Sequence, residues 1–314
     1  MSTEPSGRLS LSTAYHITKS TSWPALLRET ERLGFARLEL NVEIPEAYLR
    51  EAALSVEKGE IIVSSLHNYC PKLKDLPRGR TIYSGYILNS DDEAERKLAV
   101  EHTKKTIEWA ARLNASAVVL HLGDVPTEPS GREFAKYQQE FGKNGRLYDK
   151  YWEAITRDRA KKSRVCLEGL MRGLDKLLPF ALEKKIKLGF ENRIYYHEMP
   201  NIEELSILLD NYKGAPAGYW HDSGHAEIFI RNGWAKSHGE FLAPFKGRTV
   251  GMHLHDVKKF SDHYAPGCGD LDFKAITPFV TPDTVLVVEA HAKSSPGEVR
   301  ASIEYLAKCG IPSN

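Results

Sequence analysis

The sequence lacks long apolar runs, paired cysteines and an excess of charge of one sign. It has no run of 18 apolar residues, the usual minimum for a membrane-spanning helix, so no membrane partner is expected. Residues 1–8 are polar and lack the apolar segment of a secretory signal. With 43 basic and 42 acidic residues the formal net charge is +1, so no overall field attracts nucleic acid.

Cysteine is scarce and scattered. The four cysteines form no CxxC pair, and they lie far apart, at Cys70, Cys166, Cys268 and Cys309. This spacing predicts reduced thiols in a cytoplasmic protein. It argues against a disulfide framework and against a structural zinc site built on thiolates.

The chain does contain a regular alternation of short apolar runs and helical patterns, and 41% of its residues are hydrophobic. Apolar runs that follow helical patterns are typical of buried parallel strands. The predicted strands are 9–16, 36–40, 61–67, 115–121, 186–191, 215–222, 249–253 and 284–289. The predicted helices are 22–33, 45–58, 91–113, 164–184, 202–211, 224–232, 272–279 and 297–308.

Eight strands alternating with eight helices predict an α/β protein, a single (β/α)8 TIM barrel domain over 1–314. A doubly wound open sheet is the competing fold, but it would place its site at one switch point. One connection is much too long for a loop: residues 124–160, after the fourth strand, are rich in charges and aromatics. We expect this insertion to be an ordered lid or an oligomer contact.

Four of the predicted strands end in a residue type that binds metal ions: Glu191, Asp222, His253 and Glu289. Successive spacings are 31, 31 and 36 residues, close to one strand–helix repeat of about 30 or more, so each group lies at the same end of its strand. Any one of them alone is more often a cap, an ion pair or a core residue. Together, three carboxylates at one rim would repel one another without a cation. The oxygen-rich set predicts a divalent ion: Mn²⁺, Mg²⁺ or Co²⁺, or Zn²⁺ through the imidazole.

Further candidate ligands surround this set. His67 and His121 close the third and fourth strands, and His225, His255 and His263 lie just beyond the strands that carry Asp222 and His253. These five histidines are predicted to hold a second metal ion or to contact substrate.

Two basic residues are predicted to bind substrate. Arg193 begins the loop after Glu191 and can present a bidentate fork to a phosphate or carboxylate. Lys258, next to Lys259, could bind the same kind of group, although such a pair is more often a solvated surface feature.

Several segments resemble a known family, the xylose isomerase-like TIM barrel superfamily, over nearly the whole chain. This superfamily holds sugar (phosphate) isomerases and epimerases, hydroxypyruvate isomerase, inosose dehydratase and endonuclease IV. The segments are Phe190-Glu191-Asn192-Arg193, Trp220-His221-Asp222-Ser223-Gly224-His225-Ala226, Met252-His253-Leu254-His255-Asp256 and Val287-Val288-Glu289. The resemblance implies one ion held by Glu191, Asp222, His253 and Glu289. It favours His253 over His255, because the family ligand is commonly followed three residues later by an acidic residue, here Asp256.

The resemblance implies a metal-dependent isomerase or epimerase that acts on a small sugar, keto-sugar or sugar phosphate through an enediolate. Glu191 and Glu289 would then be the catalytic acid and base. The alternative is a metal-dependent phosphohydrolase with a site like that of endonuclease IV, acting on a small phosphomonoester or on nucleic acid. The family's Asp-x-His in the seventh loop is Ser261-Asp262-His263 here, which puts a third ion in doubt.

The partner expected from these readings is a small-molecule substrate; a nucleic acid is not expected, and a homo-oligomer is allowed. A barrel that binds a metal ion and a ligand without turnover is the remaining reading, from a different class of function.

Overall fold

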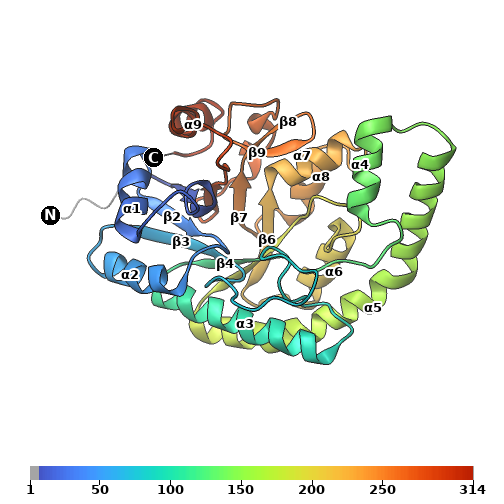
Figure 1. The fold of residues 1–314 in the computed structure, drawn as a ribbon, viewed down its shortest axis with the longest axis horizontal. Coiled ribbons are helices and arrows are strands. Elements are labelled where there is room, and N and C mark those ends of the chain that lie inside the picture. The colour runs from blue at the N-terminus through green and yellow to red at the C-terminus, as the bar shows by residue number, and fades with distance from the viewer. Residues whose placement is uncertain (1–6, 314) are drawn as a thin grey trace.

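Eight parallel strands close into a barrel in the computed structural model, which describes residues 7–313 (Figure 1). Each strand pairs with its neighbours in chain order, and the last pairs with the first. The barrel strands are β1 Leu9–Ser12, β2 Arg37–Leu40, β3 Ile62–His67, β4 Ala117–Leu120, β5 Lys187–Glu191, β6 Ala217–Asp222, β7 Thr249–Leu254 and β10 Val285–Val288. The predicted α/β TIM barrel is confirmed. Residues 1–6 and 314 of the predicted domain lie outside the described residues.

Helices surround the barrel and begin at side chains that cap them. Ser22, Asn201 and Ser295 accept hydrogen bonds from backbone N–H groups of the first turns of α1, α6 and α9. The helices are α1 Trp23–Arg32, α2 Glu46–Glu57, α3 Glu93–Arg112, α4 Gly131–Phe141, α5 Arg146–Lys184, α6 Ile202–Asn211, α7 Ser223–Arg231, α8 His238–Leu242 and α9 Pro296–Lys308. Within residues 7–313, no helix combines the length and the apolar character needed to cross a bilayer.

The predicted helix 272–279 is wrong. The segment forms two short 3-10 turns, η3 Phe273–Ala275 and η4 Thr277–Phe279, the first capped by Asp272. Pro278 has no N–H to donate, so a continuous α-helix would lack a hydrogen bond there. Two further 3-10 turns lie elsewhere, η1 Thr13–Tyr15 and η2 Ala243–Phe245, and the first ends the predicted strand 9–16 early.

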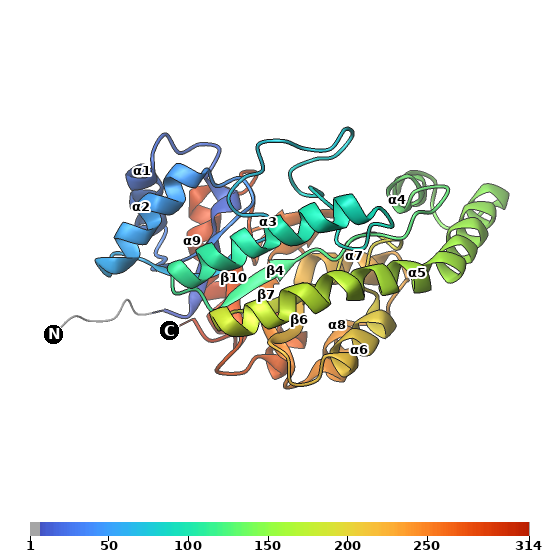
Figure 2. The same cartoon turned by 90° about the horizontal axis from the view of Figure 1, so that it is seen from below.

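The insertion after β4 is ordered and helical. It consists of α4 and the N-terminal part of α5, which together extend to one side of the barrel (Figures 1 and 2). Phe134 of α4 stacks between Trp152 of α5 and Trp234, with ring centroids 5.7 and 6.0 Å away. The order predicted for this segment is confirmed, whereas a role as lid or oligomer contact stays a prediction.

A small antiparallel hairpin follows β7, made of β8 Asp256–Lys258 and β9 Ser261–Tyr264. The sequence did not indicate it. The buried Asp256 carboxylate fixes the loop after the hairpin, because it accepts backbone hydrogen bonds from Gly267, Gly269 and Leu271 at 2.8–3.0 Å. Asp256 is thus occupied by backbone donors.

The lower interior of the barrel is filled by one large side chain. Trp220 is in register with Glu191 and Gly251, so these residues face the interior together. A Cβ atom added at Gly251 or at Gly189 would overlap the indole ring, so the two glycines make room for it. Ala117, Val119 and Val287 pack in the same cluster. Asp222 and His253 follow Trp220 and Gly251 by two residues on their strands, so they face the same interior nearer the carboxyl ends.

Candidate metal centre

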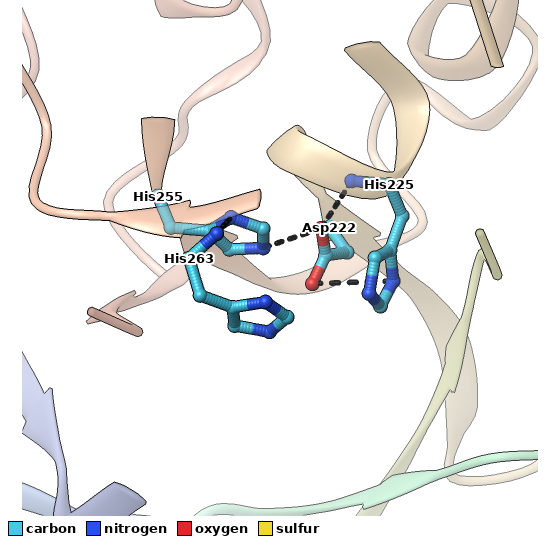
Figure 3. Close-up of side chains that lie close together, drawn as sticks. All are labelled: Asp222, His225, His255 and His263. Carbon is cyan, nitrogen blue, oxygen red and sulfur yellow. Dashed lines mark hydrogen bonds and ion pairs between the residues drawn. The ribbon is translucent and has the colours of Figure 1, made fainter. Parts of the chain in front are cut away.

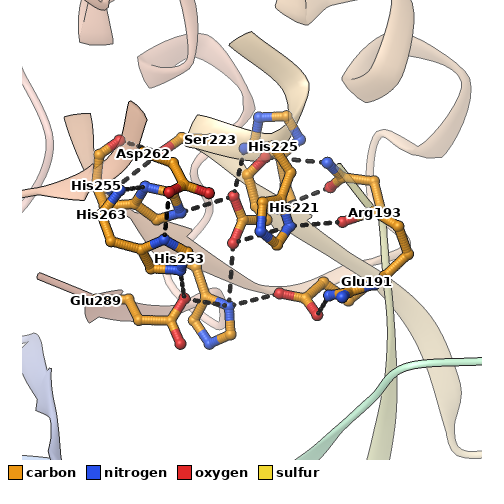
Figure 4. Close-up of polar contacts among 12 residues, drawn as sticks. Glu191, Arg193, His221, Ser223, His225, His253, His255, Asp262, His263 and Glu289 are labelled. Carbon is orange, nitrogen blue, oxygen red and sulfur yellow. Dashed lines mark hydrogen bonds and ion pairs between the residues drawn. The ribbon is translucent and has the colours of Figure 1, made fainter. Parts of the chain in front are cut away.

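Glu191, Asp222, His253 and Glu289 converge at the carboxyl ends of the strands, as predicted from their spacing. Nδ1 of His253 lies 2.8 Å from Oε1 of Glu191, 3.3 Å from Oε2 of Glu289 and 3.6 Å from Oδ2 of Asp222 (Figure 4). One ligand atom from each of the four lies within 4.8 Å of the other three, and all four residues are buried. We call these four residues the tetrad.

The tetrad fits a divalent cation. It brings three carboxylates together, and Oδ2 of Asp222 has no hydrogen-bond partner within residues 7–313 although it is fully buried. Burial alone would raise the pKa of the Asp222 carboxyl, but the nearby His225 and His255 rings hold it well below its usual value. A buried anionic oxygen without a partner is costly, and a metal ion would satisfy it.

Glu39 is part of this centre and was missed by the sequence reasoning. Its fully buried carboxylate lies 3.0 and 3.1 Å from Nε2 of His253, and its Oε2 also accepts a 2.8 Å hydrogen bond from Ser65 Oγ. Nδ1 of the same ring faces Oε1 of Glu191 at 2.8 Å, so both ring nitrogens face carboxylates. Burial alone would lower the pKa of His253, but Glu289 and Glu39 hold it well above its usual value. A cation in the tetrad would replace the hydrogen on Nδ1, while Glu39 would keep the hydrogen on Nε2. The available signal was a lone acidic residue between Leu38 and Leu40 in the predicted strand 36–40.

Replacing Glu39 by glutamine is expected to weaken metal binding about 10–100-fold, the usual effect of changing a carboxylate that orients a ligating histidine. The amide could then present its NH₂ to His253 and leave the ring free to turn. Competition with a chromophoric chelator measures the change in Kd. Glu57→Gln on α2 is the matched control, because Glu57 is exposed. Equal affinity of wild type and Glu39→Gln would contradict the assigned role.

A second cluster consists of Asp222, His225, His255 and His263 (Figure 3). The backbone N–H of His263 donates to Nδ1 of His255 at 2.9 Å, so the hydrogen of the neutral His255 ring is on Nε2. That nitrogen lies 2.8 Å from Oδ1 of Asp222. In this tautomer His255 has no lone pair left for an ion, and its Nε2 forms no hydrogen bond within residues 7–313. Nδ1 of His225 faces the Asn192 carbonyl at 3.2 Å, which leaves its Nε2 available.

His263 lies between two other imidazole rings. Its ring stacks on His255 and on His291, with centroids 4.1 and 3.9 Å away, and its Nε2 is 3.6 Å from Glu289 Oε2. Burial would lower the pKa of His263, but Asp262 and Glu289 raise it to about 10. His291 was also missed by the sequence reasoning, and with His263 and Glu289 it forms another group able to hold a cation.

A third cluster, His67, His121 and Glu191, lies on the other side of the tetrad. Nε2 of His121 is 2.7 Å from Glu191 Oε2, and Nε2 of His67 is 3.8 Å from the same oxygen. Arg193 reaches into this cluster, with its Nη1 2.6 Å from Nε2 of His121, and Figure 4 shows it beside Glu191. Lys258 does not join any of the clusters; it is exposed, with its ammonium 4.4 Å from the Tyr264 ring centroid. Its role in substrate binding stays a prediction.

The barrel topology and the clustered ligands agree with one known family. Residues 27–309 match the family model described as Xylose isomerase-like TIM barrel. The chain belongs to this family. The resemblance inferred from the strand-end motifs is therefore confirmed, and this xylose isomerase-like TIM barrel has buried His, Glu and Asp groups that can hold a metal ion.

Known relatives of this xylose isomerase-like barrel are distant. The structure of a D-tagatose 3-epimerase-like protein is 18% identical, covers 96% of both chains and has a TM-score of 0.65. The 3-keto-D-glucoside 4-epimerase of E. coli is 12% identical, with 97% of this chain and 100% of that chain covered and a TM-score of 0.67. An uncharacterized protein of Sinorhizobium fredii is 22% identical over 237 residues, 74% of this chain but only 63% of that protein. At these identities the structural likeness shows the fold.

The two glutamates of the tetrad differ in how they are held. Both oxygens of Glu191 are engaged, Oε1 by Nδ1 of His253 at 2.8 Å and Oε2 by Arg193 at 3.0 Å. Only Oε2 of Glu289 is engaged, by His253 and His263. Within the described part of the chain, Oε1 of Glu289 forms no ion pair or hydrogen bond. This xylose isomerase-like barrel therefore leaves one carboxylate oxygen of the tetrad available for a substrate.

Proposed function

We propose that the chain is a metal-dependent isomerase or epimerase that acts on a small sugar, keto-sugar or sugar phosphate. The observation that carries the proposal is a buried group of four residues that can hold a metal ion and in which Glu289 keeps an oxygen available. A centre of this kind can hold a cation and still offer a base beside it. The names of two structural neighbours, a D-tagatose 3-epimerase-like protein and a 3-keto-D-glucoside 4-epimerase, support the same class of chemistry.

The proposed reaction moves a proton at a carbon next to a carbonyl group. A divalent ion in the tetrad would polarise neighbouring hydroxyl and carbonyl oxygens of the substrate and so acidify that carbon. Glu289 would remove the proton through Oε1. Burial alone would raise the pKa of Glu289, but His253 and His263 lower it, so the carboxylate is ionised at neutral pH and ready to act as a base.

Glu191 is less free than Glu289 to transfer a proton. Its Oε1 faces Nδ1 of His253 at 2.8 Å and its Oε2 accepts a 3.0 Å hydrogen bond from Arg193, so it can return a proton to the substrate only if one of these contacts opens. We therefore propose that Glu289 removes the proton and that Glu191 acts chiefly as a ligand.

Turnover in D₂O tests the proposal. Metal-loaded protein incubated with a panel of small ketoses and their phosphates is expected to place deuterium at the carbon next to the carbonyl, seen by NMR in product and in recovered substrate. The Glu289→Gln variant is expected to place none there at the same protein concentration. Conversion of a substrate with no deuterium at that carbon would contradict proton transfer as the reaction.

Hydrolysis of a phosphate ester is the second candidate. It is favoured by the three further groups of candidate ligands beside the tetrad, because neighbouring ions can activate water and bind a phosphate. The hydrogen on Nε2 of His255 and the position of Arg193 argue against hydrolysis, because each leaves fewer ligand atoms for further ions. Release of phosphate from a panel of phosphomonoesters would favour this candidate over the isomerase. With a net charge of +1, we propose a small-molecule substrate for either reaction.

A further inference from the structure

Arg193 lies between two members of the cluster His67, His121 and Glu191. Its Nη1 is 2.6 Å from Nε2 of His121 and 3.0 Å from Oε2 of Glu191. These are the same two atoms that would ligate an ion bound by this cluster. The Arg193 side chain is only 13% exposed, and its guanidinium thus takes the position where a second cation would be expected.

The state of the His121 ring explains why a positive group is needed there. Nδ1 of His121 faces the carbonyl oxygen of Tyr83 at 3.2 Å, and a carbonyl only accepts, so Nδ1 carries the ring hydrogen. Nε2 of the same ring accepts a hydrogen bond from Nη1 of Arg193, because a guanidinium only donates. Nε2 therefore turns a lone pair toward the Glu191 carboxylate, 2.7 Å away. The N–H groups of Arg193 relieve this repulsion between two acceptors.

Glu198 and the loop around it hold Arg193 in this position. Nη2 of Arg193 is 3.3 Å from Oε1 of Glu198, whose other oxygen accepts a 2.8 Å hydrogen bond from the backbone N–H of Tyr195. Helix α5 supports the same loop, because Arg159 donates a 3.0 Å hydrogen bond to the carbonyl of His197. Arg193 is thus fixed by Glu198 and by the loop that the inserted helix braces.

We propose that Arg193 is a built-in cation that keeps a metal ion out of the cluster His67, His121 and Glu191. An ion bound there would lie beside a fixed positive charge, and two of its ligand atoms are already engaged by Arg193. The chain accordingly binds fewer ions than its ligand clusters would suggest. The proposal concerns the number of bound ions and stands apart from the isomerase activity.

Counting ions in four proteins tests the proposal: wild type, Arg193→Met, His121→Ala, and the double variant with both changes. Each is loaded with Zn²⁺ and separately with Mn²⁺, freed of unbound ion, and analysed for metal per chain by mass spectrometry. Arg193→Met, which keeps the length of the side chain and removes its charge, is expected to bind one ion more than wild type. His121→Ala is expected to bind as many as wild type, and the double variant to lose the extra ion.

Two results would overturn the proposal. The first is an equal count for wild type and a folded Arg193→Met protein, and the second is the loss of one ion in His121→Ala. If near-UV circular dichroism finds Arg193→Met unfolded, Glu198→Gln takes its place, because it removes the anchor and leaves the arginine. A binding event absent from wild type is then expected in calorimetric titration with Zn²⁺, and its absence would refute the idea. The ion bound by the tetrad is counted separately by comparing each protein with its Asp222→Asn variant. Loss of the ion from the tetrad can then be told apart from a change at the cluster His67, His121 and Glu191.

Discussion

Replacing Asp222 by asparagine is expected to remove tight metal binding. Oδ1 of Asp222 accepts the backbone hydrogen bond of His225 at 2.7 Å and faces Nε2 of His255 at 2.8 Å. Because the backbone N–H of His225 donates to Oδ1, the amide oxygen of asparagine would stay in the Oδ1 position. Its NH₂ group would then take the Oδ2 position and turn two hydrogens toward the ion. We expect an affinity loss larger than the roughly 10–100-fold typical of changes outside the ligand set.

Metal content after gel filtration, together with a chelator titration, measures this effect. Asp210→Asn is the matched control, since Asp210 lies on the surface, pairs with Arg248 and is 72% exposed. The control is expected to bind metal like wild type. Retention of wild-type affinity by Asp222→Asn would mean that the tetrad is not the metal centre.

Replacing Glu289 by glutamine is expected to lower kcat by about 10²–10⁴-fold, the range typical of a lost general acid or base. The amide keeps an oxygen for the ion, but it cannot take a proton through the position of Oε1. The variant should therefore lose turnover and solvent-proton exchange together while it still binds an ion, although more weakly. This combination distinguishes loss of the base from loss of the metal.

Rate and metal content have to be measured on the same saturated sample. Glu304→Gln on α9 is the control, because Glu304 is exposed and pairs only with Lys308 of the same helix. A Glu289→Gln protein that carries its ion and keeps more than a tenth of wild-type kcat would contradict the assignment of Glu289 as the base.

The barrel and the tetrad could be predicted from the sequence because both depend on local patterns. Each apolar run sets one strand, and in a parallel barrel all the strand ends meet at one rim, so a ligand at the end of each run is enough to place Glu191, Asp222 and His253 together. A prediction from this spacing of about 31 residues needs no knowledge of how the side chains pack. Glu289 follows by the same argument from the last strand.

Glu39 and Arg193 could not be placed in this way. Glu39 contacts His253 across the barrel over a separation of 214 residues, and that contact depends on barrel closure and strand stagger. Arg193 begins a loop whose direction is set by Glu198 and by the inserted helix α5. The hairpin 256–264 was missed for a related reason, since tertiary hydrogen bonds to Asp256 shape its surroundings rather than a local turn signal.

The position of Trp220 bears on the order in which the ion and the substrate bind and leave. Its indole packs against His253, with ring centroids 5.1 Å apart, and fills the space that Gly189 and Gly251 leave. We therefore expect ion and substrate to reach the tetrad from the carboxyl ends of the strands. The ion lies deeper than the substrate would, so it has to bind first and leave last. A bound sugar would then block the release of the ion beneath it. Exchange of the metal would then be governed by how long the sugar stays.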